Sequence, residues 1–215
     1  MIIGVSGNIG AGKSSLSRIL SEKLGFEVVY EAVDENPYLA DFYKDMKRWA
    51  FHSQLFFLMK RFDFLKRVDS EGRVIIQDRT IYEDVNIFAR NLWLLGHIDD
   101  RDWGLYQDSF ETISEHLKMP AGFVYIRCSV ETLMKRISTR GRDYESSASV
   151  EYIKKLNDLY DSWFDELEPG RKIIIDGDRL DFVLSERDRQ TVTRQVSNFV
   201  SRLSAGVQAK LFDSC

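Results

Sequence analysis

The stretch MIIGVSGNIGAGKSS at residues 1–15 decides the fold of this chain. An apolar run at residues 2–5 leads into the spacing Gly7-x-x-x-x-Gly12-Lys13-Ser14, and the segment SLSRILSEKL that follows has the apolar periodicity of a helix. A glycine-rich turn between a strand and a helix predicts a phosphate-binding loop, because backbone N–H groups and the positive end of the helix can surround a di- or triphosphate. The sequence therefore predicts that the chain binds a nucleoside triphosphate.

Every residue of this loop is a candidate contact for ATP. The candidates are Gly7, Asn8, Ile9, Gly10, Ala11, Gly12, Lys13, Ser14 and Ser15. Lys13 is expected to reach the β- and γ-phosphates, and the Ser14 hydroxyl is expected to hold Mg²⁺. The alternative is a glycine-rich turn with a chance lysine, which the agreement of strand, spacing and helix disfavours.

The composition is that of one ordinary globular unit. The chain has 215 residues, of which 44% are hydrophobic and 30% are charged, and this is enough for one sizeable core. Its net charge of −4 argues against a nucleic-acid polymer as substrate, because a basic surplus is needed to neutralise many phosphates. The two cysteines, Cys128 and Cys215, lie far apart and indicate a reduced, intracellular protein.

The sequence predicts neither a membrane segment nor a signal peptide. No apolar run approaches the roughly 20 residues of a membrane span, and residues 1–5 enter a strand directly. The three histidines are scattered, and no Cys/His spacing predicts a zinc site. We therefore expect a cytoplasmic protein without a membrane partner.

Short apolar runs alternate with longer segments of helical periodicity. The runs predict strands at residues 2–6, 26–30, 73–77, 122–127 and 172–176, and the periodic segments predict helices at 47–68, 82–93, 103–118 and 150–167. Near-continuous apolar strands are typical of a parallel sheet that is buried on both faces. The pattern predicts an α/β fold of three layers, a five-stranded parallel sheet flanked by helices. We expect one domain at residues 1–203 and a flexible tail at 204–215.

Polar residues follow several of these runs, where the carboxyl ends of parallel strands meet. Glu31 follows the second run and could accept a proton from a substrate hydroxyl, with a solvated strand-end acid as the alternative. Asp78 follows the third run and could contact Mg²⁺, with a helix cap as the alternative. Arg79 could pair with Glu31 or contact the oxygen that attacks the phosphate.

The segment RISTRGRDYE at residues 136–145 predicts a lid. Arg136, Arg140 and Arg142 surround a glycine after a helical stretch, and planar guanidinium groups could neutralise a phosphoryl group in transfer. The alternative is a solvated basic turn, and the presence of a phosphate loop in the same chain disfavours this alternative. We expect this arginine-rich lid to span about residues 136–149.

Taken in order, these segments resemble the deoxyribonucleoside kinases. The resemblance rests on the phosphate loop, Glu31, the W-x-F-x-x-Q spacing at residues 49–54, the Asp78-Arg79-Thr80 segment and the R-x-x-x-R-G-R lid. The stretch NPYLADFY at 36–43 is similar to the bacterial deoxyadenosine/deoxyguanosine kinase branch. The resemblance covers residues 1 to about 203. It implies a P-loop kinase fold and an enzyme of nucleotide salvage that uses Mg²⁺ and ATP to phosphorylate the 5′-hydroxyl of a deoxyribonucleoside.

The resemblance also implies roles at the sugar of the acceptor. Glu31 matches the general base for the 5′-hydroxyl, and Arg79 matches the arginine that contacts this hydroxyl and orients the base. Tyr43 and Glu145 match the pair that holds the 3′-hydroxyl.

Further matches concern the two nucleobases. Gln54 matches the glutamine that hydrogen-bonds the edge of the acceptor base, and its amide offers both a donor and an acceptor. Phe88 matches the aromatic residue that stacks on that base. Asp181 and Phe182 fall in the adenine-binding loop of the family, where Phe182 and Arg140 sandwich the ATP base. Without the resemblance, a core position would be the ordinary interpretation of Phe88 and Phe182, and a core or packing position is the alternative for Gln54 and Tyr43.

Arg61 and Asp84 are expected to set base preference. Relatives that phosphorylate thymidine have small or apolar residues at these positions, and relatives that accept purines or deoxycytidine have this charged pair. A carboxylate can accept from an exocyclic amine, which thymine lacks. We therefore expect deoxyadenosine, deoxyguanosine or deoxycytidine to be preferred, with a purely structural ion pair as the alternative.

Two other functions fit a phosphate-binding loop. One is a nucleoside monophosphate kinase such as a thymidylate kinase, and the other is a nucleotide-binding switch without an acceptor. The commonest kind of switch is disfavoured, because the chain has no N-K-x-D guanine motif. We also expect a homodimer, because the apolar run at residues 56–59 exceeds what one sheet face can cover, and relatives pair through the corresponding helices.

Overall fold

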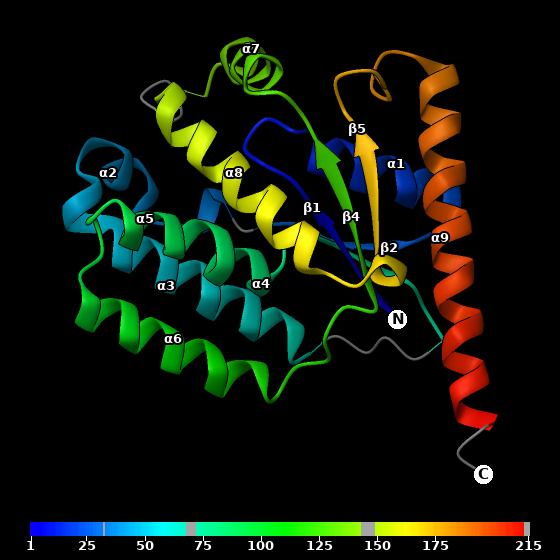
Figure 1. Cartoon of the computed structure of the whole chain (residues 1–215), viewed down its shortest axis with the longest axis horizontal. Coiled ribbons are helices and arrows are strands. Elements are labelled where there is room, and N and C mark those ends of the chain that lie inside the picture. Colours follow the sequence, from blue (N-terminus) through cyan, green and yellow to red (C-terminus); the bar gives the residue numbers. More distant parts are fainter. Residues whose placement is uncertain (32, 68–71, 143–148, 213–215) are drawn as a thin grey trace.

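The computed structural model describes residues 1–31, 33–67, 72–142 and 149–212, apart from the side chains of Asp34 and residues 207–212. Its centre is a five-stranded sheet with every strand parallel to its neighbours, in the order β2-β3-β1-β4-β5 (Figure 1). The strands are β1 (Ile2–Ser6), β2 (Glu27–Val29), β3 (Ile75–Asp78), β4 (Gly122–Arg127) and β5 (Lys172–Asp176). The predicted parallel sheet is confirmed, and β1, β4 and β5 have the predicted bounds.

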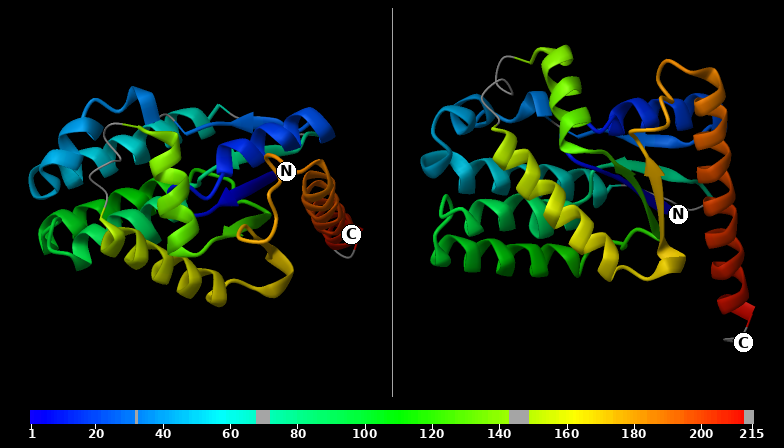
Figure 2. Two further views of the ribbon diagram at one scale, coloured as in Figure 1. Left: turned by 90° about the horizontal axis from the view of Figure 1, so that it is seen from above. Right: turned by 45° about the horizontal axis from the view of Figure 1, so that its top comes forward.

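Helices cover both faces of the sheet, so the predicted three layers are confirmed. Helices α1 and α9 pack on one face, and α3 to α6 and α8 form the layer on the other (Figures 1 and 2). No described helix is long and apolar enough to cross a membrane. The helical elements are α1 (Lys13–Leu24), η1 (Val33–Glu35), α2 (Leu39–Lys44), α3 (Met46–Leu65), α4 (Ile81–Glu83), η2 (Asp84–Ala89), α5 (Arg90–Leu94), α6 (Asp100–Ser114), α7 (Val130–Arg140), α8 (Val150–Glu166), η4 (Pro169–Arg171) and α9 (Glu186–Phe212).

The order of the strands places the phosphate-binding loop. β1 pairs with β3 on one side and with β4 on the other, so that Val5 lies opposite both Asp78 and Val124. The chain therefore leaves β1 where the two halves of the sheet diverge. Ligands of open parallel sheets bind at such a point, outside the carboxyl ends of the strands.

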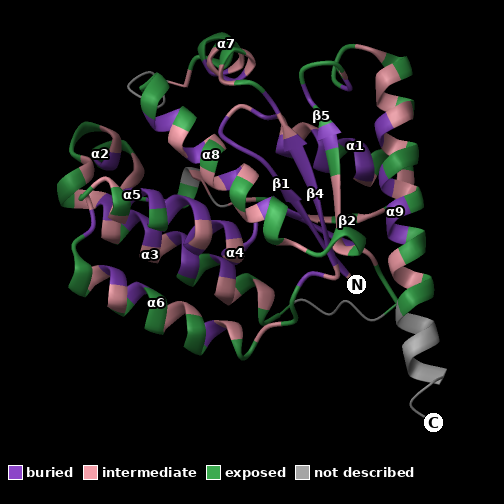
Figure 3. Cartoon of the chain, viewed as in Figure 1, coloured by how far each residue is buried: buried purple, intermediate pink, exposed green. Residues whose placement is uncertain are grey.

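Tight packing holds β4 on both faces, and buried residues concentrate in the strands (Figure 3). On the α9 side, a Cβ atom at Gly122 would lie only 2.6 Å from the ring of Phe199. On the α8 side, the ring of Tyr125 stacks on Tyr160 and Phe164, with centroids 5.6 and 4.4 Å away. Close packing of this kind resists deformation, so the residues at the carboxyl ends of the strands are held by a rigid sheet.

The bounds of β2, β3 and α3 differ by a few residues from the expected ones, and three further elements differ in kind or extent. The helix expected at 82–93 contains a π-helical segment, η2, between α4 and α5. The helix expected at 103–118 begins earlier, at Asp100, because the Asp99 carboxylate caps it by accepting the N–H groups of Arg101 and Asp102. The residues expected to form a tail from 204 onward continue helix α9 as far as Phe212.

Candidate active site

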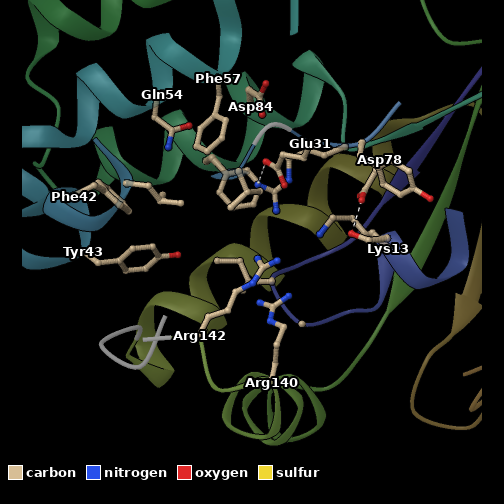
Figure 4. Close-up of a pocket in the computed structure, with 18 of the residues that line it drawn as sticks. Lys13, Glu31, Phe42, Tyr43, Gln54, Phe57, Asp78, Asp84, Arg140 and Arg142 are labelled. Carbon is tan, nitrogen blue, oxygen red and sulfur yellow. Dashed lines mark hydrogen bonds and ion pairs between the residues drawn. The ribbon is translucent and has the colours of Figure 1, made fainter. Parts of the chain in front are cut away.

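A cavity of about 260 Å³ lies at the carboxyl ends of β1, β2 and β3 (Figure 4). Residues from the phosphate loop, the β2 end, α3, the β3–α4 junction and the lid all face it. Its lining comprises Ile9, Gly10, Lys13, Ser14, Tyr30, Glu31, Val33, Leu39, Phe42, Tyr43, Gln54, Phe57, Asp78, Arg79, Asp84, Phe88, Arg140, Arg142 and Tyr152. The structure thus brings together most residues that the sequence singles out.

The phosphate loop needs glycine at positions where the backbone turns left-handed. Gly10 has φ 82° and Gly12 has φ 100°, a region that side chains disfavour. Helix α1 begins directly afterwards at Lys13, whose ammonium donates to the Asn8 carbonyl at 3.2 Å. Burial, assisted by the positive charge of Arg79, lowers the pKa of Lys13 to about 8. The loop, the helix start and this lysine form a site for a polyphosphate.

Asn8 anchors this loop instead of facing the cavity. Its amide nitrogen donates to the Ile153 carbonyl at 2.9 Å and to the Asn157 side chain at 2.7 Å, both on α8. Its side-chain oxygen accepts the N–H of Ile9 at 2.8 Å. The side chain is therefore occupied within the protein, and a contact of Asn8 with ATP as a member of the loop stays a prediction.

Ser14 and Asp78 form a pair of oxygen ligands beside Lys13. The Ser14 hydroxyl donates to one Asp78 carboxylate oxygen at 2.5 Å, and the other oxygen, Oδ1, is buried with no hydrogen-bond partner among the described residues. Burial raises the pKa of Asp78. A hydroxyl and an unsatisfied carboxylate suit a hard cation such as Mg²⁺. Asp78 does not cap the next helix, because that position belongs to Thr80.

Glu31 is held by two arginines. Arg79 Nη1 donates to Glu31 Oε1 at 2.8 Å, and Arg61 Nη2 approaches the same oxygen at 3.5 Å. Burial acts to raise the pKa of Glu31, but Arg79, Arg61 and Lys13 outweigh it, and the pKa lies below its ordinary value. Glu31 is therefore ionised at neutral pH, and both of these arginine contacts fall on Oε1.

Arg79 has an unusual backbone. Its φ of 66° is the one left-handed value among the described residues other than glycine, and such a conformation costs roughly 1–3 kcal/mol. The guanidinium lies 3.9 Å from the centroid of the Phe88 ring. One face of Phe88 thus supports Arg79, and base stacking by Phe88 stays a prediction. Backbone strain at a cavity is characteristic of a functional residue.

Arg61 lies behind Asp84 and not in the cavity. Arg61 Nε and Nη2 donate to the two Asp84 oxygens at 2.8 and 3.3 Å, and Nη1 donates to the Arg79 carbonyl at 2.7 Å. Asp84 lines the cavity, whereas Arg61 does not. The Arg61 guanidinium is occupied by protein groups, and direct contact of Arg61 with a substrate stays a prediction.

The opposite end of the cavity is largely aromatic. Gln54 and Phe57 point inward from α3, and Phe42 and Tyr43 point inward from α2 (Figure 4). Gln54 is almost fully buried, so its amide is a polar group in an apolar wall. Such a wall with few polar groups suits a nucleobase.

Sequence reasoning missed six residues of the lining. They are Tyr30, Val33, Leu39, Phe42, Phe57 and Tyr152. Phe57 could have been found, since it lies one helical turn after Gln54. The others lie in segments whose orientation the apolar pattern does not fix.

The lid divides into two parts. Arg140 and Arg142, at the end of α7, point into the cavity (Figure 4). Arg136 does not, because its guanidinium donates to the carbonyls of Ala11 at 3.1 Å and Gly177 at 2.8 Å, bracing the phosphate loop from outside. Its contact with the transferred phosphoryl group stays a prediction. Glu145 lies outside the described residues.

Both residues of the expected adenine-binding loop are engaged within the protein, and the adenine sandwich stays a prediction. Phe182 is 2% exposed, and its ring packs beneath the phosphate loop, where a Cβ atom at Gly12 would lie 3.2 Å from it. The Asp181 carboxylate accepts the N–H groups of Val183 and Leu184 and closes a turn. Phe182 thus has no free face to offer a base.

Comparison with known proteins agrees with this geometry. The family model described as deoxynucleoside kinase matches residues 3–201. The chain is 39% identical to a deoxyguanosine kinase of Lactobacillus johnsonii, over 91% of this chain and 90% of that one. It is 36% identical to a deoxyadenosine kinase of Lactobacillus acidophilus, over 91% and 94%. These relatives confirm the predicted resemblance to the bacterial branch.

A solved structure is similar as well. The deoxyadenosine kinase from M. mycoides with the products dCMP and dCDP bound matches with a TM-score of 0.80 and 31% identity, over 92% of this chain and 99% of that one. The same enzyme with dATP bound matches with a TM-score of 0.79 and 30% identity, over 92% and 99%. The family match runs from β1 into α9 and takes in every element around the cavity, so the chain belongs to the deoxynucleoside kinase family, whose members are phosphotransferases.

Proposed function

We propose that this enzyme transfers the γ-phosphoryl group of ATP to the 5′-hydroxyl of a deoxyribonucleoside. The observation that carries the proposal is that the phosphate loop and the Glu31–Arg79 pair line one cavity. Donor phosphates and an acceptor hydroxyl can therefore adjoin, as in-line transfer requires. A nucleoside monophosphate kinase would need a further site for the phosphate of its acceptor.

Different residues of the cavity serve the acceptor hydroxyl, the transferred phosphoryl group and the metal ion. Glu31 accepts the proton of the 5′-hydroxyl, and Arg79 positions Glu31 through their ion pair. Lys13 and the lid residues Arg140 and Arg142 stabilise negative charge on the phosphoryl group. Ser14 and Asp78 would hold Mg²⁺, which when bound neutralises charge on the donor phosphates.

Asp84 and Gln54 supply the base preference. Asp84 reaches the cavity as a carboxylate held by Arg61, and it can accept from an exocyclic amine. Adenine, guanine and cytosine have such an amine, and thymine does not. The names of the relatives, a deoxyguanosine kinase and deoxyadenosine kinases, support the same preference. We place deoxyadenosine, deoxyguanosine and deoxycytidine above thymidine.

One kinetic panel tests the proposal. Release of ADP from ATP, and of GDP from GTP, is measured with each of the four deoxynucleosides and with their monophosphates. The expected result is turnover that depends on a deoxynucleoside, with thymidine the poorest. Turnover only with monophosphates, or equal turnover without any acceptor, would contradict it.

We also propose a homodimer that acts in the cytoplasm, where ATP is abundant. Met59 on α3, Leu94 on α5 and Leu105 on α6 are 48%, 58% and 55% exposed. Part of the apolar surplus expected for this region is buried within the chain, since Trp93 stacks on Trp103 of α6. The apolar side chains that stay exposed support the proposal that a second subunit covers this surface.

A further inference from the structure

The peptide bond that follows Arg79 is held from both sides. Its carbonyl, from Arg79, accepts Arg61 Nη1 at 2.7 Å. Its N–H, from Thr80, donates to Glu83 Oε1 at 3.0 Å. The orientation of this peptide bond relative to the one before it sets the backbone conformation of Arg79, whose φ of 66° is disfavoured. On the other side of the strained residue, the Arg79 N–H donates to the Val5 carbonyl at 3.1 Å, so hydrogen bonds hold both peptide bonds that flank Arg79.

Glu83 is a fully buried carboxylate that reaches three separate elements. Oε1 also accepts the Ser6 hydroxyl at the end of β1, at 2.9 Å, and Oε2 accepts the Tyr160 hydroxyl of α8, also at 2.9 Å. Sequence analysis did not single this residue out, and it does not line the cavity. The contacts fix the position of its carboxylate relative to β1, where the phosphate loop begins, and to α8.

A helix cap alone does not account for these contacts. Thr80 and Glu83 form a capping box, which stabilises the first turn of a helix. The Ser6 and Tyr160 hydroxyls are not needed for that purpose, yet they orient the same carboxylate. The result is a rigid acceptor aimed at the peptide bond that follows Arg79, one of the two whose relative orientation sets the Arg79 conformation.

We propose that Glu83 is a positioning residue for phosphoryl transfer. By accepting the Thr80 N–H, it keeps Arg79 left-handed, and this places the guanidinium on Phe88 and against Glu31. Without that acceptor, Arg79 relaxes to an ordinary conformation and leaves Glu31. The conformational part of the proposal is independent of substrate, and the kinetic part rests on the proposed function, in which Arg79 and Glu31 act on the acceptor hydroxyl.

Three variants separate positioning from packing. Glu83→Met fills the same space without an acceptor, Glu83→Gln keeps an oxygen for the Thr80 N–H, and Tyr160→Phe removes only the bond to Oε2. Burial raises the pKa of Glu83 against the opposing charges of Arg79 and Lys13, so a neutral amide suits the site. Should Glu83→Met fail to fold, Glu83→Leu replaces it, because leucine also lacks an acceptor for the Thr80 N–H.

Crystal structures and kinetics of these variants give the test. In Glu83→Met, φ of Arg79 should become negative and kcat should fall about 10²-fold, the usual effect of a misplaced group, while KM for ATP stays within about threefold. Glu83→Gln and Tyr160→Phe should retain the wild-type Arg79 conformation and kcat within about threefold. An unchanged Arg79 in Glu83→Met, or an equal loss of kcat in Tyr160→Phe, would overturn the proposal.

A double-mutant cycle adds a readout that general destabilisation does not reproduce. If Glu83 acts through Arg79, Glu83→Met should cost little further kcat in an Arg79→Met background, measured per folded active site. A full, additive loss there would overturn the proposal. Absence of any kinase activity in the wild type would instead refute the proposed function, and the crystallographic comparison would still decide the conformational claim.

Discussion

At the scale of the residue, the charges around Glu31 govern the chemistry. The positive charges of Arg79, Arg61 and Lys13 hold the pKa of Glu31 down in spite of its burial. A carboxylate with a lowered pKa is a weak base, so its contribution comes largely from its position next to the attacking hydroxyl. The same positive charges attract the donor phosphates. In the proposed reaction, one cluster would therefore act on both the nucleophile and the phosphoryl group that it attacks.

Replacing Glu31 by Gln should lower kcat by roughly 10²–10⁴, the usual contribution of a general base. KM for ATP should stay near that of the wild type, because Lys13 and the loop amides remain. Steady-state kinetics with saturating nucleoside measures both. Glu35→Gln is the matched control, since Glu35 is exposed and pairs with Lys60 at the surface. Near-normal turnover in Glu31→Gln would remove this residue from the mechanism.

Lys13 should make ATP binding sensitive to pH. Its pKa of about 8 means that the ammonium loses its proton in mildly alkaline solution, so ATP affinity should fall by up to about tenfold per unit above that pH. Between this pKa and its ordinary value of about 10.4, the unfolded chain binds more protons at Lys13. Lys13 therefore makes the stability of the nucleotide-free protein rise with pH over the same interval.

Calorimetric titration with ATP from pH 6.5 to about 9.5, which spans the lowered pKa, checks the Lys13 effect. Lys13→Met should bind ATP weakly and lose the pH dependence. Lys23→Met is the control, because Lys23 lies exposed at the far end of the same helix. An ATP affinity that does not change across this range in the wild type would contradict the assignment.

At the scale of the element, η2 shows where apolar periodicity stops being informative. The spacing at residues 82–93 correctly predicts helix, yet a π-helical segment needs a change in the backbone hydrogen-bond pattern that side-chain spacing does not encode. The same limit applies to Asn8 and Arg136. The sequence places these residues in the phosphate loop and the lid, but the orientation of their side chains depends on α8 and on the loop after β5. Their side chains donate hydrogen bonds to protein groups that are remote in sequence.

The α3–η2 pair of Arg61 and Asp84 should control base preference. The double variant Arg61→Met with Asp84→Ala removes the buried pair together and avoids an unpaired charge. The ratio of kcat/KM for thymidine to that for the best substrate should rise. Total kcat should fall, because Arg61 also holds the Arg79 carbonyl.

Competition assays with mixed deoxynucleosides measure this ratio directly. The exposed ion pair of Lys60 and Glu35 provides the control, as Lys60→Met with Glu35→Gln should leave the ranking unchanged. If the Arg61/Asp84 double variant keeps the substrate ranking of the wild type, the pair is structural only.

At the scale of the whole molecule, the sheet is the part that the sequence predicts best. Apolar runs bounded by polar strand ends locate β1, β4 and β5 to the residue, and the carboxyl-end rule brings Glu31, Asp78 and Lys13 to one cavity. Residues such as Tyr152 and Phe42 could not be located this way, because which helix face meets the cavity depends on how whole helices pack.

The exposed apolar residues of α5 and α6 should join two copies of the chain. Light scattering at micromolar concentration should give twice the 25.1 kDa mass of one chain. Leu94→Glu with Leu105→Glu should shift the protein to the monomer, because burying two carboxylates is costly. Leu184→Glu is the control, as Leu184 is exposed on the loop before α9. A monomeric wild type would contradict the dimer.

The central claim is that donor phosphates and nucleoside share one cavity, and inhibition by a product triphosphate tests it most directly. The deoxynucleoside triphosphate of the best substrate should compete with both ATP and nucleoside, with its base beside Gln54 and its phosphates along Gly10–Ser14. The Gln54→Ala substitution should weaken inhibition by this triphosphate. Inhibition that competes with ATP alone, and is indifferent to the base and to Gln54→Ala, would contradict the account.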